Sequence, residues 1–280
     1  MPQSPPDLTD RTALVRNRAR GRGDLFLHAI AREEISVRLA EVNRRFTTPA
    51  VVTGHAQPWA DLMPGARLVE DTPVLDLEPG AHDLVIHAMA LHWASDPVGQ
   101  LVQARRALVP DGLFLGVLLG GQTLAALRAA LAQAESDLTG GLSPRVLPMA
   151  EIRDLGALLQ RAGFALPVAD ALGQDVAYRD FWALCRDLRA MGESNSLSAR
   201  PRHPTRRAVF ERASALYTAH HSDNSGRVLA RFELIFLTGW APDSSQPSPL
   251  RPGSARARLA DVLGAEETPL PDSIKIPRQD

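Results

Sequence analysis

Residues 83 to 121 read DLVIHAMALHWASDPVGQLVQARRALVPDGLFLGVLLGG, and this stretch decides the fold. Its two ends, 83–93 and 113–119, are nearly continuous apolar runs of strand length, and residues 96–108 between them have helical spacing. Asp96 is well placed as the N-cap of this helix, with Pro97 at its first position. Apolar strands joined by a helix are typical of a parallel sheet covered on both faces, so the stretch predicts a Rossmann-like α/β core.

The pattern continues on both sides of this stretch. The expected elements are an amphipathic N-terminal helix at 25–46, strands at 50–53, 67–70, 166–178 and 231–240, and helices at 121–138 and 149–164. Residues 180–221 are mainly helical in pattern and form an insertion before the last strand. The sequence therefore predicts one α/β domain at 1–245, followed by a mostly loop or disordered tail at 246–280 that is rich in Pro and Ser.

Composition excludes several classes of function. A net charge of -1 gives no global attraction to nucleic acid or to anionic membranes. The longest apolar stretch, 112–121, is too short to span a bilayer. Cys185 is the single cysteine, so no intramolecular disulfide can form, and the eight histidines lack metal-ligand spacing. We expect no metal site, no nucleic-acid partner and no transmembrane segment.

The first residues of the chain and its use of arginine in place of lysine bear on the compartment of the protein. The start, MPQSPPDLTD, lacks the plan of a secretory signal, whereas the arginines between 11 and 22 would suit an organelle transit peptide. Lys275 is, however, the single lysine of the chain, and this bias towards arginine is typical of a GC-rich genome. The sequence therefore predicts a bacterial cytoplasmic protein in preference to one of the mitochondrial matrix.

Several motifs carry a family resemblance. The DLV opening, LHW and the PDG turn between 83 and 112 resemble class I S-adenosylmethionine-dependent methyltransferases. GGLSP at 140–144, MGESN at 191–195 and PGSA at 252–255 make the chain most similar to the family of complex I assembly factors that are arginine hydroxylases. The resemblance implies S-adenosylmethionine as cofactor and a protein substrate, an iron–sulfur subunit of respiratory complex I.

The cofactor loop departs from the family's pattern. The resemblance implies an acid at position 52 and glycines at 54, 56 and 58, but the segment VTGHAQP supplies Val52, Gly54, Ala56 and Pro58. Glycine lets the backbone pass close to the cofactor, and Pro58 also removes a backbone donor. The strand at 67–70 aligns best with the family's third strand, so the second strand and its ribose-binding acid are expected to be missing. Cofactor binding is predicted to be weak or absent.

Candidate site residues follow from the resemblance and from the carboxyl edge of the sheet, where open α/β sheets bind ligands. On the cofactor side they are Gly54, His55, Gln57, Asp71, Ala88, His92 and Trp93. Facing the substrate they are Gly120, Gly121, Glu193, Ser194 and Asn195. Simple structural roles remain open for them, such as a turn at Asp71 or the end of a strand at Gly120. No catalytic residue is assigned.

Three functions therefore remain open. The first is an S-adenosylmethionine-dependent transferase that modifies a protein substrate in complex I assembly. The second is a cofactor-free assembly factor, which the altered loop favours and the intact LHW and GGQTL motifs oppose. The third is an acyl-carrier ester methyltransferase, which leaves MGESN and PGSA unexplained.

Overall fold

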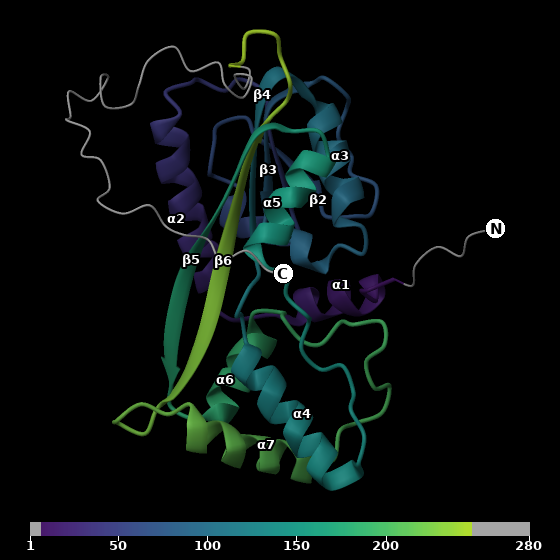
Figure 1. Ribbon diagram of the computed structural model, residues 1–280, viewed down its shortest axis with the longest axis vertical. Helices are drawn as coiled ribbons and strands as arrows, with labels where there is room; N and C mark the ends of the chain where they lie inside the picture. Colours follow the sequence, from purple (N-terminus) through teal and green to yellow (C-terminus); the bar gives the residue numbers. More distant parts are fainter. Residues whose placement is uncertain (1–6, 248–280) are drawn as a thin grey trace, which may run out of the picture. The chain divides into compact units, whose positions relative to one another are not determined.

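The computed structural model describes residues 7–247 (Figure 1). The chain divides into two compact units, Met1–Ser244 and Ser245–Asp280, and all the helices and strands given below belong to the first. Most of the predicted tail at 246–280, with the PGSA motif, lies outside the described residues.

A six-stranded sheet forms the centre of the first unit. Its strands are β1 (Pro49–Thr53), β2 (Arg67–Glu70), β3 (His82–Ala88), β4 (Leu108–Leu119), β5 (Ala165–Tyr178) and β6 (Val228–Trp240). They lie in the order β2-β1-β3-β4-β6-β5, and β6 alone runs antiparallel to its neighbours. The predicted Rossmann-like, mostly parallel sheet with a shortened N-terminal half is confirmed.

β2 is the edge strand of the sheet on this side. It pairs directly with β1, from Ala50 opposite Arg67 to Thr53 opposite Glu70. No further strand lies outside it among the six strands of the sheet. One strand is therefore missing on this side, as expected for the shortened N-terminal half, and Glu70 is the last residue of the strand beside β1.

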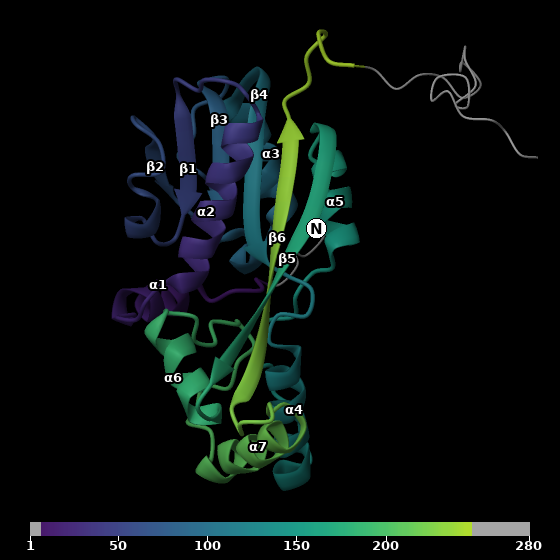
Figure 2. The same ribbon diagram turned by 90° about the vertical axis from the view of Figure 1, so that its left-hand side faces the viewer.

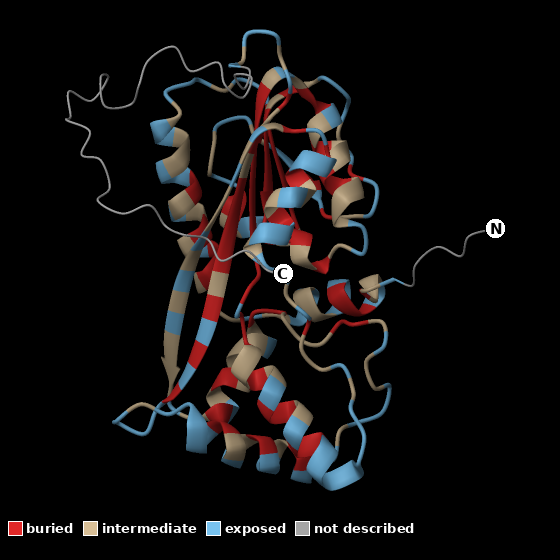
Figure 3. Ribbon diagram, in the orientation of Figure 1, coloured by how far each residue is buried: buried red, intermediate tan, exposed pale blue. Residues whose placement is uncertain are grey.

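Helices cover both faces of the sheet because alternate residues of each buried strand point to opposite sides. Leu84 and Ile86 pack in one buried cluster with α2 (Phe26–Glu41). Val85 packs in another with α3 (Pro97–Ala107) and α5 (Ile152–Arg161). Figure 3 shows the resulting buried centre of the strands. The helix predicted at 25–46 thus exists but is shorter than expected.

Three further helices gather beyond the carboxyl edge of the parallel strands, where the long β5–β6 pair reaches them (Figures 1 and 2). They are α4 (Ala125–Thr139), α6 (Phe181–Ala190) and α7 (Arg207–His220). The last two form the predicted insertion between β5 and β6, with an irregular segment at 191–206 between them. Buried Tyr217 ties α7 to β6 by donating its hydroxyl hydrogen to the Leu229 carbonyl at 2.7 Å.

Helix α1 (Arg11–Arg20) was not predicted from the sequence. It begins at Asp10, whose carboxylate accepts a hydrogen bond from the Ala13 amide at 3.0 Å. Its buried residues, Ala13 and Leu14, are adjacent and therefore give no helical periodicity. Figures 1 and 2 show α1 lying between the sheet and the layer of α4, α6 and α7.

Candidate functional site

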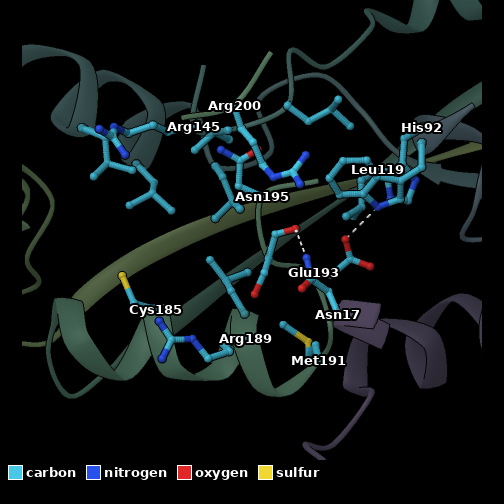
Figure 4. Close-up of a pocket in the computed structure, with 18 of the residues that line it drawn as sticks. Asn17, His92, Leu119, Arg145, Cys185, Arg189, Met191, Glu193, Asn195 and Arg200 are labelled. Carbon is cyan, nitrogen blue, oxygen red and sulfur yellow. Dashed lines mark hydrogen bonds between the residues drawn. The ribbon is translucent and has the colours of Figure 1, made fainter. Parts of the chain in front are cut away.

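Two cavities open at the carboxyl edge of the parallel strands, each of about 400 Å³. The first, here the strand cavity, lies at the ends of β1 and β2 and includes Gly54, His55, Gln57, Glu70 and Asp71 in its lining. The second, here the helix cavity, lies between the sheet edge and α4, α6 and α7 and is mostly apolar (Figure 4). The candidate site residues that line a cavity are therefore divided between the strand cavity and the helix cavity.

Helix α1 forms a wall shared by both cavities. Arg11 and Arg18 line the strand cavity, whereas Arg16 and Asn17 line the helix cavity. No local sequence pattern predicts this wall, because its contacts join residues far apart in the chain.

Asp71 is held by two arginines of α1. The Arg18 Nη1 atom donates to both carboxylate oxygens at 3.0 and 2.9 Å, and Arg11 donates to them at 3.1 and 3.3 Å. The side chains of Arg18 and Asp71 are only 7% and 5% exposed. Burial opposes ionisation of Asp71, but the two arginines outweigh it and hold the pKa of the carboxyl below its usual value. Asp71 is therefore an ionised, fully engaged group.

The Arg18 guanidinium also covers the remaining glycine of the cofactor loop. A Cβ atom added to Gly54 would lie 1.8 Å from Arg18 Nη1 and 2.8 Å from Nη2. No room is left above Gly54 for the methionine portion of S-adenosylmethionine, and the acid expected beside adenine is already paired. The residues as they stand do not fit this cofactor.

Buried histidines adjoin the same arginine. Trp59 donates its indole hydrogen to His28 Nδ1 at 3.0 Å, and the His28 and His55 rings lie 4.9 Å apart. Burial is the main cause that lowers the pKa of His28 and of His92 to about 3, and that of His55 to about 4. These imidazoles are neutral at physiological pH, and the positive charge of Arg18 contributes to each shift.

The predicted LHW motif ends in the helix cavity. β3 stops at Ala88, which is buried and lines neither cavity, and Leu91–Trp93 form a short 3-10 helix. His92 and Trp93 both line the helix cavity, not the strand cavity. His92 and Trp93 therefore share neither of these two cavities with Gly54 and His55.

The MGESN motif meets this end of β3. The Trp93 indole donates to Glu193 Oε2 at 2.9 Å, and burial raises the pKa of Glu193. Ser194 accepts from the Asn17 side chain at 3.4 Å through its carbonyl, and the Asn195 side chain donates to the Pro144 carbonyl at 2.9 Å. All three motif residues line the helix cavity, as expected for groups that face a substrate.

Gly120 and Gly121 allow the turn after β4 to pack closely against β6. A Cβ on Gly120 would lie 2.3 Å from Ile235 Cδ1, and one on Gly121 would lie 2.2 Å from Glu233 Oε1. Neither glycine lines either cavity. The absence of side chains here lets the turn after β4 approach β6 closely.

The helix cavity also has arginines that were not among the candidate site residues. Arg145 is paired with Glu135 at 2.7 Å, and Arg200 with Asp10 at 2.8 Å. Glu193 is the one acidic residue among the described residues that line the helix cavity. Within residues 7–247 it forms no ion pair with an arginine. The cavity thus combines an apolar body with one carboxyl group near the sheet edge.

Comparisons with known proteins show the family to which the chain belongs. No family model matches the chain. It is 35% identical over 221 residues to the mitochondrial arginine-hydroxylase NDUFAF5 of Danio rerio, covering 79% of this chain and 68% of that protein. The chain belongs to the NDUFAF5 arginine-hydroxylase family. Among five NDUFAF5 relatives it spans between 43% and 68% of their length, and the human protein is 34% identical over 71% of this chain and 58% of its own.

Two further proteins are similar to part of the chain. A malonyl-[acyl-carrier protein] O-methyltransferase of Laribacter hongkongensis is 33% identical, covering 63% of this chain and 57% of that enzyme. Among solved structures, the YcgJ protein of Bacillus subtilis is 11% identical with a TM-score of 0.48, covering 75% of this chain and 99% of that one.

The family membership corrects the predicted compartment. The NDUFAF5 relatives come from eukaryotes and are named as mitochondrial, so the prediction of a bacterial cytoplasmic protein was wrong. Two other findings concern residues 7–247: no helix there is long and apolar enough to cross a membrane, and no group of three or more His, Cys, Asp or Glu side chains is placed to hold a metal ion.

Proposed function

We propose that this chain acts on a protein substrate during the assembly of respiratory complex I, and that the substrate is an iron–sulfur subunit. The observation that carries the proposal is the helix cavity, which brings the LHW and MGESN motifs together at the carboxyl edge of the sheet. Its volume of about 400 Å³ accommodates a side chain and its neighbours from a partner protein. The names of the NDUFAF5 relatives support an arginine in that partner as the target.

We assign substrate binding to Glu193 and the Trp93 indole. The indole holds one carboxyl oxygen of Glu193, which fixes the orientation of the side chain. The other oxygen is left for a donor that enters the cavity. The Asn17 side chain holds the Ser194 carbonyl and the Asn195 side chain holds the Pro144 carbonyl, so hydrogen bonds restrain the backbone that directly follows Glu193.

A complementation experiment tests this role. In a host that lacks the gene, the wild-type chain should restore complex I, whereas Glu193→Gln and Leu127→Trp should not, because the first removes the carboxylate and the second fills the cavity. Arg207→Gln is a matched control at an exposed ion pair with Glu211. Normal complex I in the deletion host, or full rescue by both cavity variants, would refute the proposal.

A second candidate function is a cofactor-free assembly factor that binds the same partner without modifying it. The specific observation in its favour is the Arg18 guanidinium above Gly54, together with Val52, Ala56 and Pro58 in the loop. Mass spectrometry of the partner subunit from complemented cells separates the two. A modified residue that disappears with Glu193→Gln supports action on the substrate, and an unmodified subunit in fully assembled complex I supports the second candidate.

A further inference from the structure

Among the described residues, four arginines line the helix cavity, and they differ in whether their charge is already paired. Arg145 donates from two nitrogens to the Glu135 carboxylate, at 3.0 and 2.7 Å. Arg200 donates to the Asp10 carboxylate and to the Leu197 carbonyl, each at 2.8 Å. Acids of the protein itself therefore largely neutralise these two arginines, which hold neighbouring segments together.

Arg16 of α1 and Arg189 of α6 are the other two. Both residues are exposed and line the cavity, so they border its opening from two different helices. With the residues that the structure describes, neither side chain forms a hydrogen bond or an ion pair. The opening therefore carries two positive charges that are free to attract an acidic group.

Glu193, the one acid of the described lining, lies elsewhere on the wall. It is half-buried, and the Trp93 indole holds one of its oxygens at 2.9 Å. Figure 4 shows the Glu193 and Arg189 side chains on separate parts of the cavity wall. The cavity thus has a negative group on its wall and positive groups at its opening.

The rest of the lining is mostly apolar. Leu127 and Leu131 of α4 and Phe232 of β6 contribute to it, and all three are buried. An arginine side chain packs its methylene stem against such a surface and keeps its guanidinium for a carboxylate. Acidic residues on either side of that arginine would stay near the opening, within reach of Arg16 and Arg189.

We propose that the helix cavity selects a substrate segment whose target arginine is flanked by acidic residues, and that Arg16 and Arg189 determine this specificity. The inference rests on the proposed function, because it takes Glu193 as the group that meets the target arginine. Acidic flanks are attracted by the two unpaired guanidinium groups, whereas basic flanks are repelled by them. Arginines in basic segments of other proteins are thereby rejected.

Isothermal titration of the full chain with short synthetic peptides tests this selection. Each peptide has a central arginine between two leucines, and its two outer positions are both aspartate, both asparagine or both lysine. For the wild-type chain we expect affinity to fall in the order aspartate, asparagine, lysine. Two exposed ion pairs together change affinity by about two- to thirtyfold, so aspartate should exceed asparagine by a factor in this range. High salt should reduce the difference.

Charge reversal assigns the selection to the two arginines. Arg16→Glu/Arg189→Glu should reverse the order, so that the lysine peptide binds most tightly. The matched control is Arg20→Glu/Arg186→Glu, which makes the same change of charge on the same two helices at residues that line neither cavity, and it should keep the wild-type order. Thermal unfolding checks that both double variants fold. If the reversal does not, Arg16→Gln/Arg189→Gln should abolish the preference for aspartate.

A fourth peptide separates this inference from the proposed function. It has aspartate at the outer positions and glutamine in place of the central arginine. The wild-type chain should bind the arginine peptide about tenfold more tightly than the glutamine peptide, and Glu193→Gln should remove that difference. If the two peptides bind alike while aspartate is still preferred to lysine, the role of Glu193 in the proposed function fails and the selection at the opening stands.

The inference is overturned if the wild-type chain binds the asparagine or lysine peptide as tightly as the aspartate peptide. It is also overturned if Arg16→Glu/Arg189→Glu keeps the wild-type order, or if the control pair changes the order as strongly. No heat from any of the peptides at millimolar concentration would overturn it as well.

Discussion

The Arg18 guanidinium of α1 binds both carboxylate oxygens of Asp71, at 3.0 and 2.9 Å, across 53 residues of sequence. Both side chains are buried, so the pair is shielded from water and from salt. It fixes α1 across the carboxyl edge of the sheet and places the guanidinium above Gly54. The wall between the two cavities depends on this contact.

Asp71→Asn is expected to destabilise the protein by about 3–5 kcal/mol, because it leaves the Arg18 charge buried and uncompensated. Urea unfolding followed by circular dichroism measures the change. Arg207→Gln is the control, since its exposed pair with Glu211 should contribute about 0.5 kcal/mol or less. If both variants lost equally little, the Arg18–Asp71 pair would not hold α1 in place.

Stability should fall as the pH is lowered from 7.5 to 5. His28 is buried and its folded-state pKa is lowered to about 3, against an ordinary value of 6.5. The unfolded chain therefore takes up the proton first, and stability is lost as the pH falls below about 6.5 towards 3. His28 alone accounts for up to about 2 kcal/mol between pH 6.5 and 5. Denaturant unfolding at several pH values checks the slope.

The variant His28→Gln assigns this pH dependence. Its amide oxygen can still accept the Trp59 hydrogen bond, but its side chain does not titrate. The loss of stability between pH 7.5 and 5 should therefore be smaller in the variant than in the wild type. An equal loss would show that His28 is not the titrating group.

Gly121→Ala is expected to destabilise the protein by about 1–3 kcal/mol. Gly121 has φ +52°, and a Cβ there would lie 2.2 Å from the Glu233 carboxylate. Gly141→Ala, in the neighbouring GGLSP motif, is a matched control, because its nearest neighbour would be Thr139 Oγ1 at 3.8 Å. Thermal unfolding of the two variants compares them, and equal melting temperatures would contradict a packing role for Gly121.

The sequence predicted the sheet well because each strand carries its own local signal. β3 and β4 contain the apolar runs at 84–86 and 113–119, and Asp96 caps the helix between the two strands by accepting from the Gly99 amide at 2.8 Å. Turn residues and helical spacing act over short distances along the chain. The elements that could be predicted are those whose residues determine them locally.

The divided site could not be predicted, because it depends on pairs of residues far apart in sequence. Asp71 was expected beside the cofactor, but nothing near it in the chain shows that Arg18 returns to bind it. The place of β2 in the sheet is likewise set by its pairing with β1 and not by its own residues. His92 and Trp93 were placed on the cofactor side, whereas α1 puts them in the helix cavity.

The central structural claim is that Arg18 closes the position of S-adenosylmethionine, and calorimetric titration of this compound tests it most directly. Access above Gly54 requires the buried pair with Asp71 to break, which costs about 3–5 kcal/mol, or roughly two to four orders of magnitude in affinity. We predict no saturable binding to the wild-type chain at low micromolar concentration, and binding at least about tenfold tighter to Arg18→Ala than to the wild type. Low-micromolar binding to the wild type, undiminished relative to Arg18→Ala, would contradict the claim.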